Sequence, residues 1–241
     1  MPRPGGACSS YLFRAGQTAV LVDIGSGSVG KLQTVSDCRR LDAIVVTHMH
    51  ADHFLDLVPL RYGRKHGPSR LEPALPLWLP PGGCAVLAAA AAVFSPDNPH
   101  FFSETFDVRE YDESQVLLVK ELTLSFRRTR HYVPAFAVRV HCGGTSIVYS
   151  ADTAPCDAVV EHARHASIFL CEAALGLSAE EGERGHSSAV EAGEMAERAG
   201  VGRLLITHYA SGVDPQALAD AAARRFRGPI TIAYDGLEVV A

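Results

Sequence analysis

The chain has 241 residues, 47% of them hydrophobic and 20% charged, and its 22 basic and 27 acidic side chains give a net charge of −5. This length and composition predict a globular protein with a sizeable core, and they exclude the disordered, fibrous and membrane-spanning classes. The acidic balance argues against a protein that holds nucleic acid by bulk electrostatic attraction.

The cysteines and the first residues favour a cytoplasmic location. The six cysteines are scattered without a CxxC pair, in a chain far longer than disulfide scaffolds usually are, which indicates reduced thiols. No apolar stretch typical of a signal peptide follows the N-terminus.

In chain order, the hydrophobic pattern predicts an alternation of strands and helices. In the first half we expect strands over residues 11–14, 18–23, 43–47 and 75–79, and helices over residues 25–40, 54–65 and 85–94. In the second half we expect strands over 116–128, 135–141, 146–149, 167–171, 203–207, 229–233 and 237–240, and helices over 155–164, 188–200 and 215–225. The prediction is a single α/β domain over residues 1–241, with two packed sheets and helices outside.

One segment carries most of the chemistry: Thr47-His48-Met49-His50-Ala51-Asp52-His53, directly after a predicted strand. Imidazole nitrogen and carboxylate oxygen are common zinc ligands. In an extended or looping backbone His48 and His50 point the same way and can bind one ion, while Asp52 and His53 can face an adjacent ion. A polar, solvated loop is the alternative, but HxHxDH after a strand is far denser in metal-ligand residues than chance composition supplies.

Two metal sites need more ligands than this segment supplies. His131, Asp152 and His208 each follow the end of a predicted strand, and Thr207-His208 repeats the pattern of Thr47-His48 after an apolar strand. Each alone would be an ordinary surface or core residue. Together with HxHxDH they form a set of the right type and number for a two-metal centre.

These motifs resemble the metallo-β-lactamase superfamily, and within it the branch of ribonuclease Z and the cyclic nucleotide phosphodiesterases. The resemblance covers nearly the whole chain, through residues 8–12, 23–27, 48–57, 150–153, 171–173, 186–189 and 207–208. It implies the αββα sandwich, which consists of two packed mixed β-sheets with helices on their outer faces.

The resemblance also implies a dinuclear hydrolase with two Zn²⁺ ions, for which Mn²⁺ or Fe²⁺ are alternatives. The implied ligands are His48, His50 and His131 for one ion, Asp52, His53 and His208 for the second, and Asp152 as the bridge.

In the implied mechanism a metal-bridging hydroxide attacks phosphorus. Asp52 orients or deprotonates the water, and His186, which is not a ligand, stabilises the transition state or protonates the leaving group. For Glu172 two interpretations stay open: an acid that holds the tautomer of His186, or an ordinary solvated acid.

The residues around His131 and the aspartate at position 152 favour the phosphodiesterase branch. Ribonuclease Z inserts a long arm that clamps transfer RNA between these two ligands, whereas here only a hairpin's length of chain separates them. We therefore expect a small phosphodiester substrate such as a cyclic nucleotide, no stable complex with nucleic acid, no membrane association and, by resemblance, a homodimer. Ala151 stands where the family usually has glycine, which matters only if φ is positive there.

Two other functions remain open: an ester or thioester hydrolase of a biosynthetic pathway, because such a centre also polarises carbonyls, and a metal-binding scaffold without activity. The complete ligand set argues against the scaffold.

For the cluster Arg61, Arg64, Lys65 and Arg70 a solvated helix face is favoured over a phosphate contact. A phosphate contact is a stronger candidate for the basic segment 127–130, including Arg128, because it adjoins His131. The remaining histidines, His66, His100, His141, His162 and His165, are taken as structural or surface residues.

Overall fold

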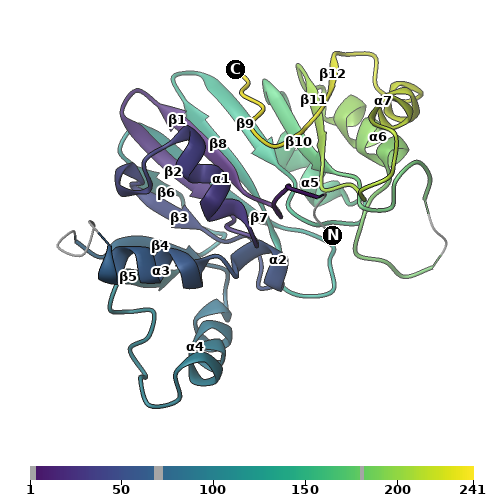
Figure 1. Ribbon diagram of the computed structural model, residues 1–241. Helices are drawn as coiled ribbons and strands as arrows, with labels where there is room; N and C mark the ends of the chain where they lie inside the picture. Colours follow the sequence, from purple (N-terminus) through teal and green to yellow (C-terminus); the bar gives the residue numbers. More distant parts are fainter. Residues whose placement is uncertain (1–3, 68–72, 180–181) are drawn as a thin grey trace. The chain divides into compact units, whose positions relative to one another are not determined.

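The computed structural model describes residues 4–67, 73–179 and 182–241 (Figure 1). The chain divides into two compact units. The N-terminal unit consists of Ala7–Asp112 and Val119–Glu121, and the C-terminal unit consists mainly of Glu113–Leu118 and Leu122–Ala241. Each unit contains a mixed β-sheet with its own helices, which confirms the predicted α/β class with two mixed sheets. The expectation of a single domain over residues 1–241 stays a prediction.

The sheet of the N-terminal unit has the strand order β1-β2-β3-β4-β5. Its strands are β1 (Tyr11–Ala15), β2 (Thr18–Val22), β3 (Ala43–Val45), β4 (Leu75–Leu79) and β5 (Phe106–Glu110). The strands β1 and β2 form an antiparallel hairpin, and β2 to β5 are parallel to one another. Because β2 and β3 are parallel and Val22 is aligned with Val45, the residues that follow these two strands emerge at the same edge of the sheet.

Helices α1 (Ser28–Val35), α3 (Leu57–His66) and α4 (Gly83–Phe94) share a hydrophobic core with β2 to β5. A short helix, α2 (Ala51–Phe54), begins within the HxHxDH segment, and a 3₁₀ turn, η1 (Cys38–Arg40), follows α1. Parallel strands buried on both faces need long apolar side chains, which Ile44, Leu77 and Leu79 provide with no exposed surface.

The sheet of the C-terminal unit has the order β12-β11-β10-β9-β8-β7-β6. Its strands are β6 (Leu117–Val119), β7 (Leu122–Arg128), β8 (Phe136–Cys142), β9 (Thr145–Tyr149), β10 (Ile168–Glu172), β11 (Leu204–Thr207) and β12 (Ile230–Ile232). Strands β7, β8 and β9 run antiparallel in turn, and β9 to β12 are parallel. The carboxyl ends of β7, β9, β10 and β11 therefore lie at one edge of the sheet.

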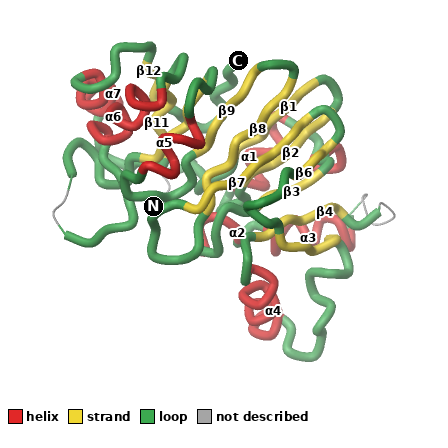
Figure 2. Tube along the Cα trace, turned by 180° about the vertical axis from the view of Figure 1, so that it is seen from behind, coloured by secondary structure: helices red, strands yellow, loops and turns green. Residues whose placement is uncertain are grey.

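Helices α5 (Asp157–Ala163), α6 (Ala189–Ala199) and α7 (Pro215–Ala223) belong to the hydrophobic core of this unit. Both views show α6 and α7 side by side (Figures 1 and 2). The predicted capping box of α6 is confirmed, since Ser188 and Glu191 cap each other's backbone, and Gly200 ends the helix in the left-handed conformation.

Several sequence predictions need correction. The expected helix over 54–65 is two helices, and the expected strand over 116–128 is the pair β6 and β7. Strand β5 at the edge of its sheet was not predicted, although its alternation of apolar and charged residues from Phe106 to Arg109 is a pattern typical of a half-buried strand. Residues 237–240 form no strand in the described structure.

Two members of the basic cluster after the first motif, Arg61 and Arg64, do not lie on a solvated helix face. Arg61 and Arg64 are only 3% and 7% exposed. Arg61 donates to the carbonyl of Phe101 and to Glu104, and Arg64 donates to the carbonyl of Pro73. Both guanidinium groups hold loops of the N-terminal unit together, while Arg70 lies outside the described residues. None of the described helices has the length and apolar character needed to cross a membrane.

Candidate metal centre

The HxHxDH segment leaves β3 and turns into α2. His48 and His53 are completely buried, whereas the side chain of Asp52 is 51% exposed. The imidazole of His48 lies 4.9 Å from that of His50 and 4.0 Å from that of His53, between ring centroids. The loop thus gathers three imidazoles, and Asp52 lies beside them with an oxygen 3.9 Å from Nε2 of His53.

The carboxylate of Asp23, the residue after β2, orients two of these histidines. Nδ1 of His53 donates to Oδ2 of Asp23 at 2.7 Å, and the backbone N–H of Thr47 donates to Oδ1 at 2.7 Å. The hydroxyl of Thr47 donates its hydrogen to Oδ2 of Asp23 at 2.9 Å. The hydroxyl oxygen therefore accepts a hydrogen bond from Nδ1 of His48, which is 3.1 Å away. Both histidines are therefore protonated on Nδ1, which leaves the lone pair of Nε2 to bind a metal.

Sequence reasoning assigned no role to Asp23, although a signal for it was present. In the sequence Asp23 directly follows the apolar run 19–22, and in the structure it is fully buried with φ of 60°. A nearby residue, Gly25, lies so close to the ligand loop that a Cβ there would be 1.9 Å from the carbonyl oxygen of Asp52. Only glycine fits at that contact.

In the C-terminal unit, four strand ends bring the remaining candidates together. Asp152 follows β9, Glu172 ends β10, and His208 follows β11, three adjacent parallel strands. His131 follows β7, whose end lies at the same edge. The register and direction of the strands thus explain why residues so far apart in sequence are neighbours.

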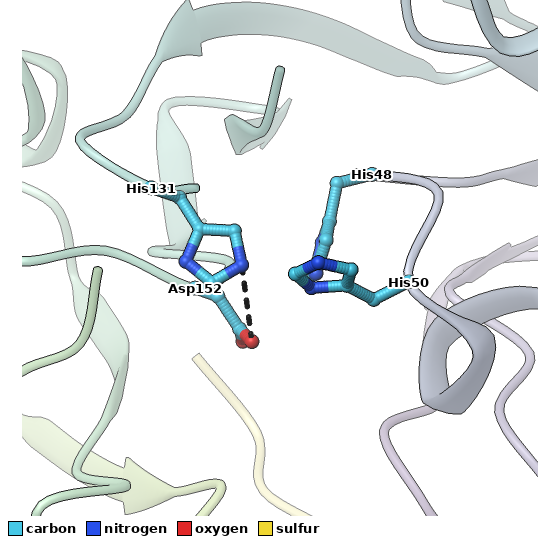
Figure 3. Close-up of side chains that lie close together, drawn as sticks. All are labelled: His48, His50, His131 and Asp152. Carbon is cyan, nitrogen blue, oxygen red and sulfur yellow. Dashed lines mark ion pairs between the residues drawn. The ribbon is translucent and has the colours of Figure 1, made fainter. Parts of the chain in front are cut away.

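His131 and Asp152 lie close together, as Figure 3 shows by the dashed line between them; the same figure draws His48 and His50. Nε2 of His131 is 3.9 Å from Oδ2 of Asp152, and both side chains are almost fully buried. Nδ1 of His131 donates to the carbonyl of Gly185 at 2.7 Å, so Nε2 again carries the lone pair. A Cβ at Gly185 would be 2.8 Å from Nδ1 of His131, so this contact also needs glycine.

His186 and Glu172 form a hydrogen-bonded pair beside Asp152. Nδ1 of His186 donates to Oε1 of Glu172 at 2.9 Å and lies 3.8 Å from Oδ2 of Asp152. Glu172 is fully buried and also accepts from the backbone N–H groups of Thr153 and Ala174. The interpretation of Glu172 as a solvated acid is therefore wrong, and its contact with His186 is present.

The pKa of His186 lies above its ordinary value. Burial lowers this pKa, but the hydrogen bond and negative charge of Glu172, together with the charge of Asp152, outweigh that effect. Burial raises the pKa of Glu172, and the hydrogen bond from His186 opposes the shift. The imidazole thus holds a proton more firmly than a free histidine does.

Three of the strand-end residues adopt the left-handed backbone conformation without being glycine: Asp23, Ala151 and His208 have φ of 60°, 51° and 50°. For residues with a Cβ this conformation is unfavourable, and it tends to occur at functional sites. For Ala151 the finding answers the question raised by the sequence, since φ is positive where the family usually has glycine.

The donor atoms fit divalent metal binding within each unit. Asp152, His186 and His208 each have one nitrogen or oxygen atom within 4.8 Å of the others, although His186, which donates Nδ1–H to Glu172, is not among the ligands that the sequence implies. In the N-terminal unit the imidazole of His48 lies beside those of His50 and His53, and the hydrogen bonds to Thr47 and Asp23 fix the tautomers of His48 and His53. Nitrogen and carboxylate donors of this kind suit zinc, manganese or iron, and the carboxylate and carbonyl partners behind the histidines are typical of metal sites.

Comparisons with known proteins agree with this chemistry. A family model described as a β-lactamase superfamily domain matches residues 18–209. The chain is 35% identical over 229 residues to an uncharacterized protein, Rv1339, of Mycobacterium tuberculosis, covering 94% of this chain and 83% of the relative. It is 29% identical over 258 residues to a ribonuclease Z of Mycobacterium bovis, covering 98% and 92%.

A third relative has a known structure. The probable metallo-hydrolase YhfI of Bacillus subtilis is 30% identical over 241 residues, covering 98% of this chain and 93% of the relative. Its crystal structure, described as that of a metallo-β-lactamase fold protein, superposes with a TM-score of 0.88 at 27% identity, over 98% of this chain and 93% of that one. These matches extend over both units of the chain.

Proposed function

This chain belongs to the metallo-β-lactamase superfamily, and we propose that it is a zinc-dependent phosphodiesterase that cleaves a small phosphodiester such as a cyclic nucleotide. The proposed ligands are His48, His50 and His131 for one ion, Asp52, His53 and His208 for the second, and Asp152 as the bridge. When bound, two such ions lower the pKa of water and neutralise charge on the phosphoryl oxygens.

The observation that carries the phosphodiester assignment is the pair of His186 and Glu172 beside Asp152. The alkoxide that leaves a phosphodiester needs a proton. Because Nδ1 of His186 is held by Glu172, the imidazole is fixed in one orientation, and its Nε2–H is the group that donates to the leaving oxygen. Asp52, whose side chain is half exposed in its loop, orients the attacking water.

The connection between His131 and Asp152 supports a small substrate. It consists of strands β8 and β9 joined by a tight turn at Gly143 and Gly144, with no inserted arm. Together with the net charge of −5, this short hairpin favours a cyclic nucleotide over a structured RNA. The expectations of two zinc ions, a cytoplasmic location and a homodimer stay predictions.

The test is a substrate panel. Zinc-loaded and manganese-loaded full-length protein is assayed with bis-p-nitrophenyl phosphate, cyclic AMP, a precursor transfer RNA and an acyl thioester. We expect turnover of the two phosphodiesters and none of the RNA. The Asp152→Asn variant should be inactive on both, and His66→Ala, which changes an exposed histidine of α3, should retain activity. Turnover of the thioester alone would establish the ester hydrolase instead.

A further inference from the structure

The C-terminal unit contains a pocket that the proposed metal centre does not use. It has a volume of about 380 Å³ and is lined by Arg127, Arg139, Ala158, Glu161 and His162. The pocket lies where α5 packs against β7 and β8. Its volume falls in the lower part of the range of small-molecule sites, about 300–1,000 Å³.

Arg139 is held firmly in the wall of this pocket. Its Nη1 donates to the carbonyls of His162 and Arg164 at 2.8 and 3.1 Å, and its Nη2 donates to the hydroxyl of Ser146 at 2.7 Å. All three partners are neutral, so these bonds orient the guanidinium without cancelling its charge. A cation fixed in this way loses little freedom when it binds an anion.

The other charged groups leave the pocket positive. Arg127 is exposed near the end of β7 and adds a second guanidinium. Glu161 forms a two-point ion pair with Arg164, a residue outside the lining set, with Nε and Oε2 2.9 Å apart. Among the described lining residues Glu161 supplies the one carboxylate, which is thus already matched by a cation, and the charges of Arg127 and Arg139 remain to attract a ligand.

His162 adds an uncharged imidazole to the lining of the pocket. Its Nε2 donates to the carbonyl of Ser125 at 3.2 Å. Burial, followed by the nearby charges of Arg127 and Arg139, lowers the pKa of His162 to about 4. Near neutral pH its imidazole therefore bears no charge, and it offers a flat surface to an uncharged part of a ligand.

We propose that this pocket is a binding site for a small organic phosphate, with Arg127 and Arg139 contacting the phosphate and Ala158 and His162 the organic part. Guanidinium groups bind phosphate oxygens through paired, charge-assisted hydrogen bonds. Both walls continue into the ligand loops: β7 leads to His131, and Asp152 precedes α5. A ligand in this pocket would therefore contact two elements that position proposed metal ligands.

Phosphate also binds metal centres, so the test must detect binding in the pocket itself. It therefore observes side chains that line the pocket. The zinc-loaded full-length protein, with labelled histidine and arginine side chains, is titrated with inorganic phosphate and with phenyl phosphate. We expect saturable shifts of the His162 imidazole and Arg127 guanidinium resonances, with phenyl phosphate binding more tightly. The His162→Asn variant identifies the imidazole signal.

Three variants decide the outcome. Arg127→Gln should weaken binding in the pocket by about tenfold or more, the effect expected for the loss of a charged hydrogen-bond partner. Ala158→Glu should abolish binding by repulsion, whereas Ala158→Lys, of similar length and opposite charge, should preserve it. Arg225→Gln, on an exposed arginine after α7, should change nothing.

The absence of a saturable shift at millimolar ligand, or equal binding by the Ala158→Glu and Ala158→Lys variants, would refute the site. Neither result depends on the proposed phosphodiesterase activity. The readout is local to the pocket, so failure of the site and failure of the proposed function are distinguishable.

Discussion

Asp23 fixes the protonation of His48 and His53 with a single buried carboxylate. In Asp23→Asn one of the two oxygens becomes an NH₂ group, which accepts no hydrogen bond, so the side chain can no longer accept from both Thr47 and His53. One imidazole then loses the partner that keeps its proton on Nδ1 and its lone pair on Nε2. We expect zinc affinity to fall by about 10- to 100-fold, as for other partners of metal-bound histidines. Competition with a chromophoric chelator measures this, with Asp107→Asn, whose side chain is 40% exposed, as the control.

His186 offers a prediction that separates proton donation from a purely structural role. His186→Ala should lower turnover of cyclic AMP, which has a poor leaving group, by about 10²–10⁴-fold. Bis-p-nitrophenyl phosphate has a good leaving group that needs no proton, so its turnover should change little. Glu172→Gln, which removes the charge behind His186, should follow the same pattern more weakly. Equal losses on both substrates, or loss of bound zinc, would contradict the role.

Ala151 has a backbone conformation that favours glycine, with φ of 51° at a fully buried position. The strain on its Cβ exceeds the entropy that glycine adds to the unfolded chain. We expect Ala151→Gly to raise the free energy of unfolding by about 0.5–1 kcal/mol, measured by urea denaturation. Ala137→Gly, in strand β8, should destabilise the protein instead, because its φ is not in the positive range.

At the scale of secondary-structure elements, sequence patterns predicted the strands that carry the proposed ligands. Short apolar runs followed by Thr-His or Ser-Ala-Asp mark the ends of β3, β9 and β11 correctly. The hydrogen-bond partners behind the ligands could not be predicted in the same way. The contact of Asp23 with Thr47 depends on the pairing of β2 with β3, and that of His131 with Gly185 on a loop distant in sequence. Hydrophobic periodicity carries no information about such pairings.

His162 of α5, which packs against β7, makes the free energy of unfolding depend on pH. In the unfolded chain the pKa of His162 is 6.5, and in the folded protein burial and the charges of Arg127 and Arg139 lower it to about 4. Above pH 6.5 both states are neutral at this residue. As the pH falls from about 6.5 to 4, the unfolded chain takes up a proton that the folded protein does not, so stability declines.

We therefore expect the free energy of unfolding, measured in urea, to fall over this pH range, and the fall to be smaller in His162→Asn. Asparagine does not titrate, and although its shorter side chain loses the hydrogen bond from Nε2 to Ser125, that loss lowers the free energy of unfolding alike at every pH. Glu161 also lines the pocket, so the matched variant Glu161→Gln tests how much Glu161 contributes to the change of the free energy of unfolding with pH. An identical pH profile in His162→Asn and the native protein would show that His162 has no part in it.

At the scale of the whole molecule, the proposed ligands are shared between the two units. The N-terminal unit contributes His48, His50, Asp52 and His53, and the C-terminal unit His131, Asp152 and His208. If ligands from both units bind the same ions, the complete set of ligands exists only in the folded chain. The folded chain then binds metal far more tightly than the unfolded chain does. Such binding stabilises the folded state by about 2.7 kcal/mol when free metal is 100 times its dissociation constant.

The number of metal ions that each variant loses tests whether one ion takes ligands from both units. The native chain should hold two zinc ions and should melt at a lower temperature after treatment with a chelator. His50→Ala and His131→Ala change residues of different units but the same proposed ion, so each should retain one ion, and the double variant should also retain one. His208→Ala combined with His131→Ala should retain none. Metal analysis after gel filtration measures these counts. If the double variant of His50 and His131 lost twice as much metal as either single variant, the two histidines would bind separate ions, and the proposed ligand set would be wrong.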